Sequence, residues 1–156
     1  MSKNDLMDKV PLARVYKHKD YTIEVAANWY IDEIDGKQTF FYGPKVGEKR
    51  IGFYVTAVEK QGKSYKDAAR KMKSEQEKNK EYKVLEQANI SDAGFKALMR
   101  RSCWYEEDMD MMLFIREIFT ESENKVFILS SSIPNSPDLE ELDSAIIHVM
   151  NSFRFN

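Results

Sequence analysis

Three long strand patterns in direct succession constrain the fold of this chain more than any other feature of its sequence. Residues 82–90, 95–105 and 109–120 are rich in apolar and aromatic side chains, and only the short segments 91–94 and 106–108 separate them. Connections this short join antiparallel neighbours, because a parallel pair needs a crossover of about a dozen residues. We therefore predict an antiparallel sheet built around these three strands.

Further segments complete the predicted sheet. The additional strands are expected at residues 15–17, 21–25, 38–42, 51–58 and 125–132. The strand at 51–58 carries apolar side chains on both of its faces, with Phe53 and Val55 on one and Tyr54 and Val58 on the other. Such a pattern is typical of a strand in the middle of a sheet whose two faces are both covered.

Two amphipathic helices are predicted to supply that cover. Ser64, followed three residues later by Asp67, resembles a capping box and begins a helix that should run to about Asn79. Ser136-Pro137 combines an N-cap with proline at the first helical position, and a closing helix should follow with its apolar stripe from Leu139 to Phe153. The predicted fold class is α+β, with a mostly antiparallel sheet of about six to eight strands and helices packed on its faces.

Length and composition favour one domain for this fold. The chain has 156 residues, of which 42% are apolar, and a domain typically has about 100–200 residues. We expect residues 1–13 to form a flexible N-terminal arm and residues 14–156 to form a single domain. The longest apolar run, residues 111–115, is far shorter than the roughly 20 residues that a membrane span requires.

Charge and chemistry argue against several classes of function. The net charge of −2 gives no overall attraction for nucleic acid, so we expect no nucleic-acid partner. Cys103 is the only cysteine, which excludes an internal disulfide, and a mid-strand position predicts a small buried hydrophobe. His18 and His148 have no cysteine or histidine at ligand spacing. We therefore expect no enzyme activity, no cofactor and no metal site.

Methionines and tryptophans are the candidate partner-binding residues. Half of the eight methionines lie between positions 99 and 112. Flexible methionine suits a surface that accepts several apolar partners, although it also fills irregular gaps in a core beneath helices. The candidates are Met99, Met109, Met111, Met112, Trp29 and Trp104. A small-ligand pocket near Trp29, Tyr30 and Trp104 is an alternative use of the aromatic residues.

The order of these elements resembles the PsbP-like superfamily, which includes PsbP, Mog and the DcrB-like domains. The resemblance covers about residues 15–155. Its carriers are Tyr21-Thr22-Ile23-Glu24-Val25 with Asn28-Trp29, the strand end Phe40-Phe41-Tyr42-Gly43-Pro44, the Ser64 helix with Ala68-Ala69, the long strand pairs and the closing segment 146–155. One departure is Ala27-Asn28, where a proline usually precedes the tryptophan. The resemblance implies an α/β/α sandwich and a non-enzymatic role, because members of this group mostly bind other proteins.

Several functions follow from this resemblance as hypotheses. The first is a protein-binding accessory or assembly module whose partner is another, unidentified protein. The second is a cytoplasmic homodimeric chaperone for transmembrane segments of type VI secretion effectors, because the bacterial Eag chaperones resemble DcrB-like domains. A third is an exported lipoprotein or periplasmic domain whose signal has been removed, and a fourth is a small-ligand binder. Residues 1–5 are hydrophilic and no apolar signal region follows, so the sequence as written predicts a cytoplasmic protein.

Overall fold

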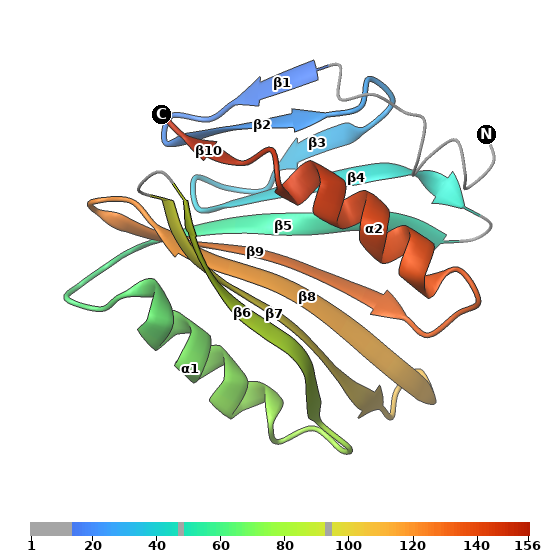
Figure 1. Cartoon of the computed structure of the whole chain (residues 1–156). Coiled ribbons are helices and arrows are strands. Elements are labelled where there is room, and N and C mark those ends of the chain that lie inside the picture. Colours follow the sequence, from blue (N-terminus) through green and yellow to red (C-terminus); the bar gives the residue numbers. More distant parts are fainter. Residues whose placement is uncertain (1–13, 47–48, 93–94) are drawn as a thin grey trace.

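A computed structural model describes residues 14–46, 49–92 and 95–156 of the chain (Figure 1). The expected N-terminal arm, residues 1–13, lies outside the described residues. The elements are β1 (Arg14–Lys17), β2 (Tyr21–Val25), β3 (Tyr30–Glu33), β4 (Gln38–Val46), β5 (Lys49–Glu59), α1 (Tyr65–Gln76), β6 (Lys83–Asp92), β7 (Phe95–Glu106), β8 (Met111–Glu121), β9 (Lys125–Pro134), α2 (Leu139–Met150) and β10 (Arg154–Phe155). Neither described helix has the length and apolar character that crossing a membrane would require.

The strands form two antiparallel sheets. The larger sheet has seven strands in the order β3-β4-β5-β9-β8-β7-β6, and the smaller sheet has the order β1-β2-β10. All of the strand pairs are antiparallel. The predicted α+β class, the antiparallel pairing and the size of the main sheet are therefore confirmed.

The two helices cover opposite faces of the large sheet. In β8, Glu117 points to α1, where the Gln76 amide donates a hydrogen bond to its carboxylate. The preceding residue, Arg116, points to the other face and forms an ion pair with Asp143 of α2 at 2.7 Å. Neighbouring residues of a strand face opposite sides of a sheet. The molecule is therefore a sandwich, with α1 on one side and α2 together with the small sheet on the other (Figure 1).

Most of the hydrophobic core lies on the α2 side. Phe41, Phe53 and Phe127 of the large sheet are fully buried there against Ile146 of α2 and Ile23 of β2. A smaller cluster lies beneath α1, and it contains Tyr65, Ala69, Leu98, Phe119 and Val126. The α1 face thus buries much less apolar surface than the α2 face, and part of it is left open.

Several strand ends differ from the sequence prediction, such as β4, which runs to Val46 and not to residue 42. Four further differences concern the two helices and the turn before β8. Ser64 and Asp67 form the predicted capping box, but α1 ends at Gln76 and not near Asn79. The second helix begins at Leu139 with Asp138 as its N-cap, so the predicted Ser136-Pro137 start is wrong. The backbone N–H of Leu139 donates to the carbonyl of Ser136, which closes a turn before the helix begins.

The other two differences concern the ends of long elements. The chain leaves α2 at Met150, so Phe153 packs into the core from the connection to β10 and not from the helix. Met109 lies in a turn before β8 and not within the strand, because residues 107–110 form that turn and Asp110 adopts a positive φ of 50°. Asn and Asp tolerate this conformation better than most residues.

Candidate functional site

The α1 side of the large sheet is the candidate site, because α1 covers only part of it. The register places Glu117 opposite Arg100 and Ser130, and Ser130 opposite Tyr54. Directly opposed residues share one face of a sheet, so all four side chains lie on the α1 side. The helix packs on β7, β8 and β9 (Figure 1), whereas the part of this face formed by β3, β4 and β5 carries aromatic side chains.

Four stacked rings and one arginine form an aromatic surface on these three strands. We define it as Tyr30, Phe40, Tyr42, Arg50 and Tyr54. Ring centroids lie 5.2 Å apart between Tyr30 and Tyr42, 4.9 Å between Tyr42 and Phe40, and 4.4 Å between Phe40 and Tyr54. The Arg50 guanidinium lies over two of these rings, 5.4 Å from the centroid of Tyr30 and 5.1 Å from that of Tyr42.

A glycine in the neighbouring strand lets these rings close over the backbone. Gly52 of β5 is opposite Tyr42 in the register. A Cβ atom at position 52 would lie 2.9 Å from the Phe40 ring and 2.6 Å from the carbonyl oxygen of Phe41. Any side chain at this position would therefore push the ring row apart, so Gly52 is part of the construction of the aromatic surface.

The aromatic surface is accessible to other molecules. Tyr30 is 55% exposed and Tyr54 is 38% exposed, although both are large residues on a sheet face. Tyrosine and arginine are enriched among the residues that dominate protein interfaces, because they combine a broad apolar body with a polar tip. The rings are stacked and cover one another's faces, with interplanar angles of 17°, 27° and 19°. This arrangement suits contact with a protein surface and contains no nucleophile–base pair.

A partly exposed apolar band continues from the aromatic surface across the sheet. We define the apolar band as Tyr42, Arg50, Pro134, Leu113 and Trp104. Arg50 and Pro134 lie beyond the last paired residues of β5 and β9, and they line one pocket of about 190 Å³ together with Leu142 of α2. Pro134 is opposite Leu113, which is opposite Trp104. The band crosses five neighbouring strands, β4, β5, β9, β8 and β7, and paired strands lie about 4.7–4.9 Å apart, so it is at least roughly 19 Å long.

Beneath α1 the same face carries a buried ion pair beside the small apolar cluster. Arg100 and Glu117 form a buried ion pair with a distance of 3.5 Å between Nε and Oε1. The Gln76 side chain donates to Glu117 at 3.1 Å, and Arg100 donates to the carbonyl of Ala69 at 3.0 Å. Burial raises the pKa of the Glu117 carboxyl, although Arg100 acts in the opposite direction. These contacts connect the sheet to α1, and α1 keeps the pair away from solvent.

The six predicted partner-binding residues do not share one surface. Met99 and Met112 point to the α2 side, whereas Met111 points to the α1 side, as their register shows. Met109 lies in the turn before β8 and is exposed. The methionines thus form no continuous stripe, and their role in binding stays a prediction.

The two tryptophans have different environments. Trp29 is 3% exposed and lies in the core beside Phe53. Trp104 is half-buried on the α1 side, where its indole N–H donates to Glu106 at 3.3 Å. Trp29, Tyr30 and Trp104 are not brought together, so the small-ligand pocket expected among them does not form.

The structure adds residues that the sequence analysis did not select. Phe40 and Tyr42 occupy alternate positions of one strand, and Tyr54 lies on the same face of the next strand. The alternation of Phe40 and Tyr42 was the signal that the sequence offered. Cys103 is buried, and burial raises the pKa of its thiol. Within the described ranges, no three or more His, Cys, Asp or Glu residues are grouped so that they could hold a metal ion.

Comparison with known proteins identifies the fold. The sequence matches no protein-family model and no curated protein sequence. The structure is similar to cyanobacterial PsbP from Synechocystis sp. PCC 6803, with a TM-score of 0.64, 12% identity, and 92% of each chain covered. It is also similar to LpqN of Mycobacterium tuberculosis, a protein involved in cell envelope biogenesis, with a TM-score of 0.63, 9% identity, and coverage of 92% of this chain and 90% of LpqN.

A third similar structure is a protein of unknown function from Pseudomonas aeruginosa, with a TM-score of 0.62 and 20% identity. The match covers 89% of this chain and 94% of that protein. These similarities extend over nearly the whole of each chain, and they include the seven-stranded sheet with its helices. The chain therefore has the PsbP-like fold.

Proposed function

We propose that this chain is a non-enzymatic protein-binding module that holds another protein on its aromatic surface. The carrying observation is that stacked tyrosines stand exposed on a sheet face while the nearby helix covers a polar ion pair. A folded chain normally covers its aromatic residues first, because they bury the largest apolar area. An exposed aromatic row beside a cation fits a partner whose contact face is apolar and carries a carboxylate that reaches Arg50.

Loss of the exposed tyrosines is expected to abolish partner capture. The test compares the wild-type chain with Tyr30→Ser/Tyr54→Ser as baits in extracts of the natural host. Interface residues that dominate binding contribute about 2 kcal/mol or more, which corresponds to about 30-fold in Kd. The affinity of a protein recovered by the wild type should therefore fall at least about 30-fold in titrations with the purified partner.

Val15→Ser is the matched control for this experiment. Val15 is 52% exposed and lies in β1 of the small sheet, away from the aromatic surface. This variant should keep the affinity of the wild type. Equal affinity of the tyrosine variant and the control would contradict the proposal. Fractionation of the host would show whether the module works in the cytoplasm or is exported.

A second candidate function is a chaperone of the Eag type that shelters apolar helices, and the apolar band favours it. The band of roughly 19 Å could lie against about 13 residues of a helix, since a helix rises about 1.5 Å per residue. Half-exposed Met111, on the same face as Leu113, extends this band with a flexible side chain that suits varied clients.

The chaperone function predicts a homodimer that keeps an apolar transmembrane peptide soluble without detergent. Light scattering gives the oligomeric state, and a sedimentation assay gives the peptide that remains soluble. Leu113→Ser/Tyr42→Ser should lose most of this protection, whereas Val15→Ser should keep it. A monomer that leaves the peptide insoluble would contradict the chaperone function, and the protein-binding module would remain under its own test.

A further inference from the structure

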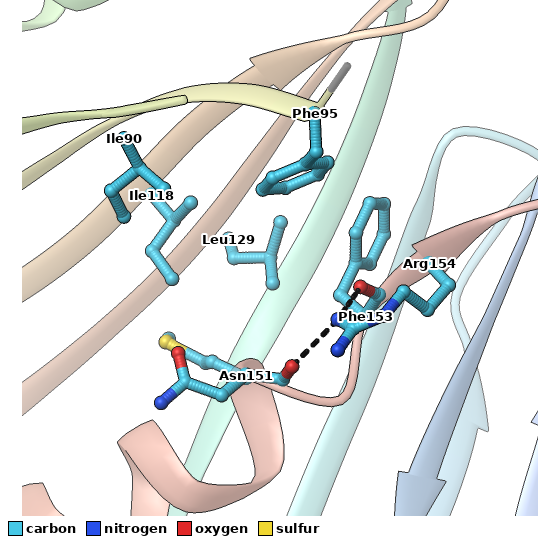
Figure 2. Close-up of a pocket in the computed structure, with 8 residues that line it drawn as sticks. Ile90, Phe95, Ile118, Leu129, Asn151, Phe153 and Arg154 are labelled. Atoms are coloured by element: carbon cyan, nitrogen blue, oxygen red, sulfur yellow. Dashed lines mark hydrogen bonds between the residues drawn. The ribbon is translucent and has the colours of Figure 1, made fainter. Parts of the chain in front are cut away.

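A separate pocket lies on the α2 side of the large sheet, at the point where α2 ends (Figure 2). Its volume is about 370 Å³, within the range of about 300–1,000 Å³ that is typical of small-ligand sites. The lining residues are Ile90, Phe95, Ile118, Leu129, Met150, Asn151, Phe153 and Arg154. It lies on the opposite side of the sheet from the aromatic surface and the apolar band, so it is a different site.

The end of α2 explains why this pocket is open. The helix stops at Met150, and the chain then turns away to pair β10 with β2. No further turn of helix therefore covers the ends of β6, β7 and β8 on this side. Ile118 and Leu129 form the buried floor, and Phe95 stands above them from the start of β7 (Figure 2). The interior is thus apolar on all of these sides.

A cation stands at the rim of this apolar interior. Nη1 of Arg154 donates to the carbonyl oxygens of Asn151 and Phe153, at 2.7 Å and 2.6 Å, and these bonds hold the guanidinium at the pocket (Figure 2). Among the residues that the structure describes, no acceptor contacts its Nε or Nη2. A planar guanidinium with two free donors matches the geometry of a carboxylate. The amide of Asn151 adds a second polar group at the same rim.

We propose that this pocket binds a small amphipathic carboxylate. The aliphatic or aromatic tail lies against the partly exposed Ile90 and Phe95, above the buried Ile118 and Leu129, and the carboxylate accepts hydrogen bonds from Arg154. Burial of the tail supplies most of the affinity, because the apolar surfaces of the tail and of the pocket lining are both removed from water. The charged head supplies selectivity, since a guanidinium pairs with a carboxylate and repels an ammonium group.

Octanoate is the probe for a direct test, with octanol, octylamine and acetate as matched ligands. Methyl NMR spectra of the whole chain should show shifts at Ile118, Leu129 and Met150 that saturate with octanoate. Octanol should bind at least about fivefold more weakly, and octylamine and acetate should bind more weakly still. Equal binding of octanoate and octanol, or an absence of shifts at these methyl groups, would overturn the proposal.

Arg154→Gln tests the assignment of the charged rim. This variant should weaken octanoate about five- to tenfold and leave octanol unchanged, whereas Arg154→Lys should retain part of the preference for octanoate. Arg70→Gln, an exposed change on α1 on the other side of the sheet, is the control and should bind octanoate like the wild type. An Arg154→Gln protein that melts like the wild type and binds octanoate equally well would exclude the carboxylate site. Binding of octanol alone would instead indicate a pocket for an apolar side chain of a partner.

Discussion

Replacing Glu117 by alanine should lower the free energy of unfolding by about 3–5 kcal/mol, because it leaves the buried Arg100 guanidinium without its counter-charge. Glu117 is fully buried and Arg100 is 2% exposed, so water cannot replace the lost carboxylate. The change also removes the acceptor of the Gln76 amide and loosens α1 from the sheet. Equilibrium unfolding in urea gives the value directly, provided that the slope of the transition stays the same.

A double variant separates the electrostatic contribution of the ion pair from the packing contribution of its two side chains. Arg100→Met/Glu117→Leu replaces both charges by apolar side chains of similar size. It should be close to the wild type in stability or exceed it, because the cost of burying two charges disappears. Together with Arg100→Met alone and Glu117→Leu alone, this double variant forms a cycle that isolates the pair energy. A loss below about 1 kcal/mol for Glu117→Ala would show that solvent reaches the pair.

The same carboxyl should make stability depend on pH. Burial raises the pKa of Glu117 in the folded protein above its value in the unfolded chain. The folded state therefore holds the proton more strongly, so the contribution of Glu117 to stability is greatest at pH values below the unfolded pKa. It decreases as the pH rises from there through the raised folded pKa. Glu117→Gln has no such group, and its stability should fall less over this range.

The strands that the pattern of apolar residues predicts are those that bury one or both of their faces. Residues 51–58 carry apolar side chains on both faces, and they form the middle of β5. In contrast, β3 contains the mostly exposed Tyr30–Glu33, and β10 has only two residues. Both β3 and β10 form because a neighbouring strand pairs with their backbone. Such backbone pairing at the edge of a sheet leaves no periodic pattern of side chains in the sequence. The prediction therefore missed these short strands while it found the long ones.

The candidate site was harder to predict for a related reason. Alternation shows that Tyr54 and Val58 share a face of one strand, but it does not show which helix lies over that face. The sequence analysis expected cover on both faces, whereas α1 packs on β7, β8 and β9 and leaves Tyr54 exposed. Clustering of methionines in the sequence was equally ambiguous, because Met111 and Met112 are adjacent and must point to opposite sides.

Replacing Trp29 by alanine should lower the free energy of unfolding by about 3–5 kcal/mol, the usual cost of removing a large buried aromatic side chain. The indole ring is packed so closely that a Cβ atom on Gly43 would lie 3.1 Å from it. The cavity that remains could not collapse easily, since Phe53 and the backbone of β4 are fixed by the sheet. Thermal and urea unfolding both measure the loss.

Trp104→Ala is the matched comparison, because the second tryptophan is half-buried on the α1 side. Its removal should cost only about 1–2 kcal/mol, since part of this side chain already contacts water. If Trp29→Ala does not fold, Trp104→Phe leaves Trp29 as the single tryptophan, and its fluorescence should resist quenching by iodide. Two results would contradict this expectation: a stability loss for Trp29→Ala no greater than that for Trp104→Ala, or rapid quenching of Trp29. Either result would place Trp29 at an accessible surface and restore it as a partner-binding candidate.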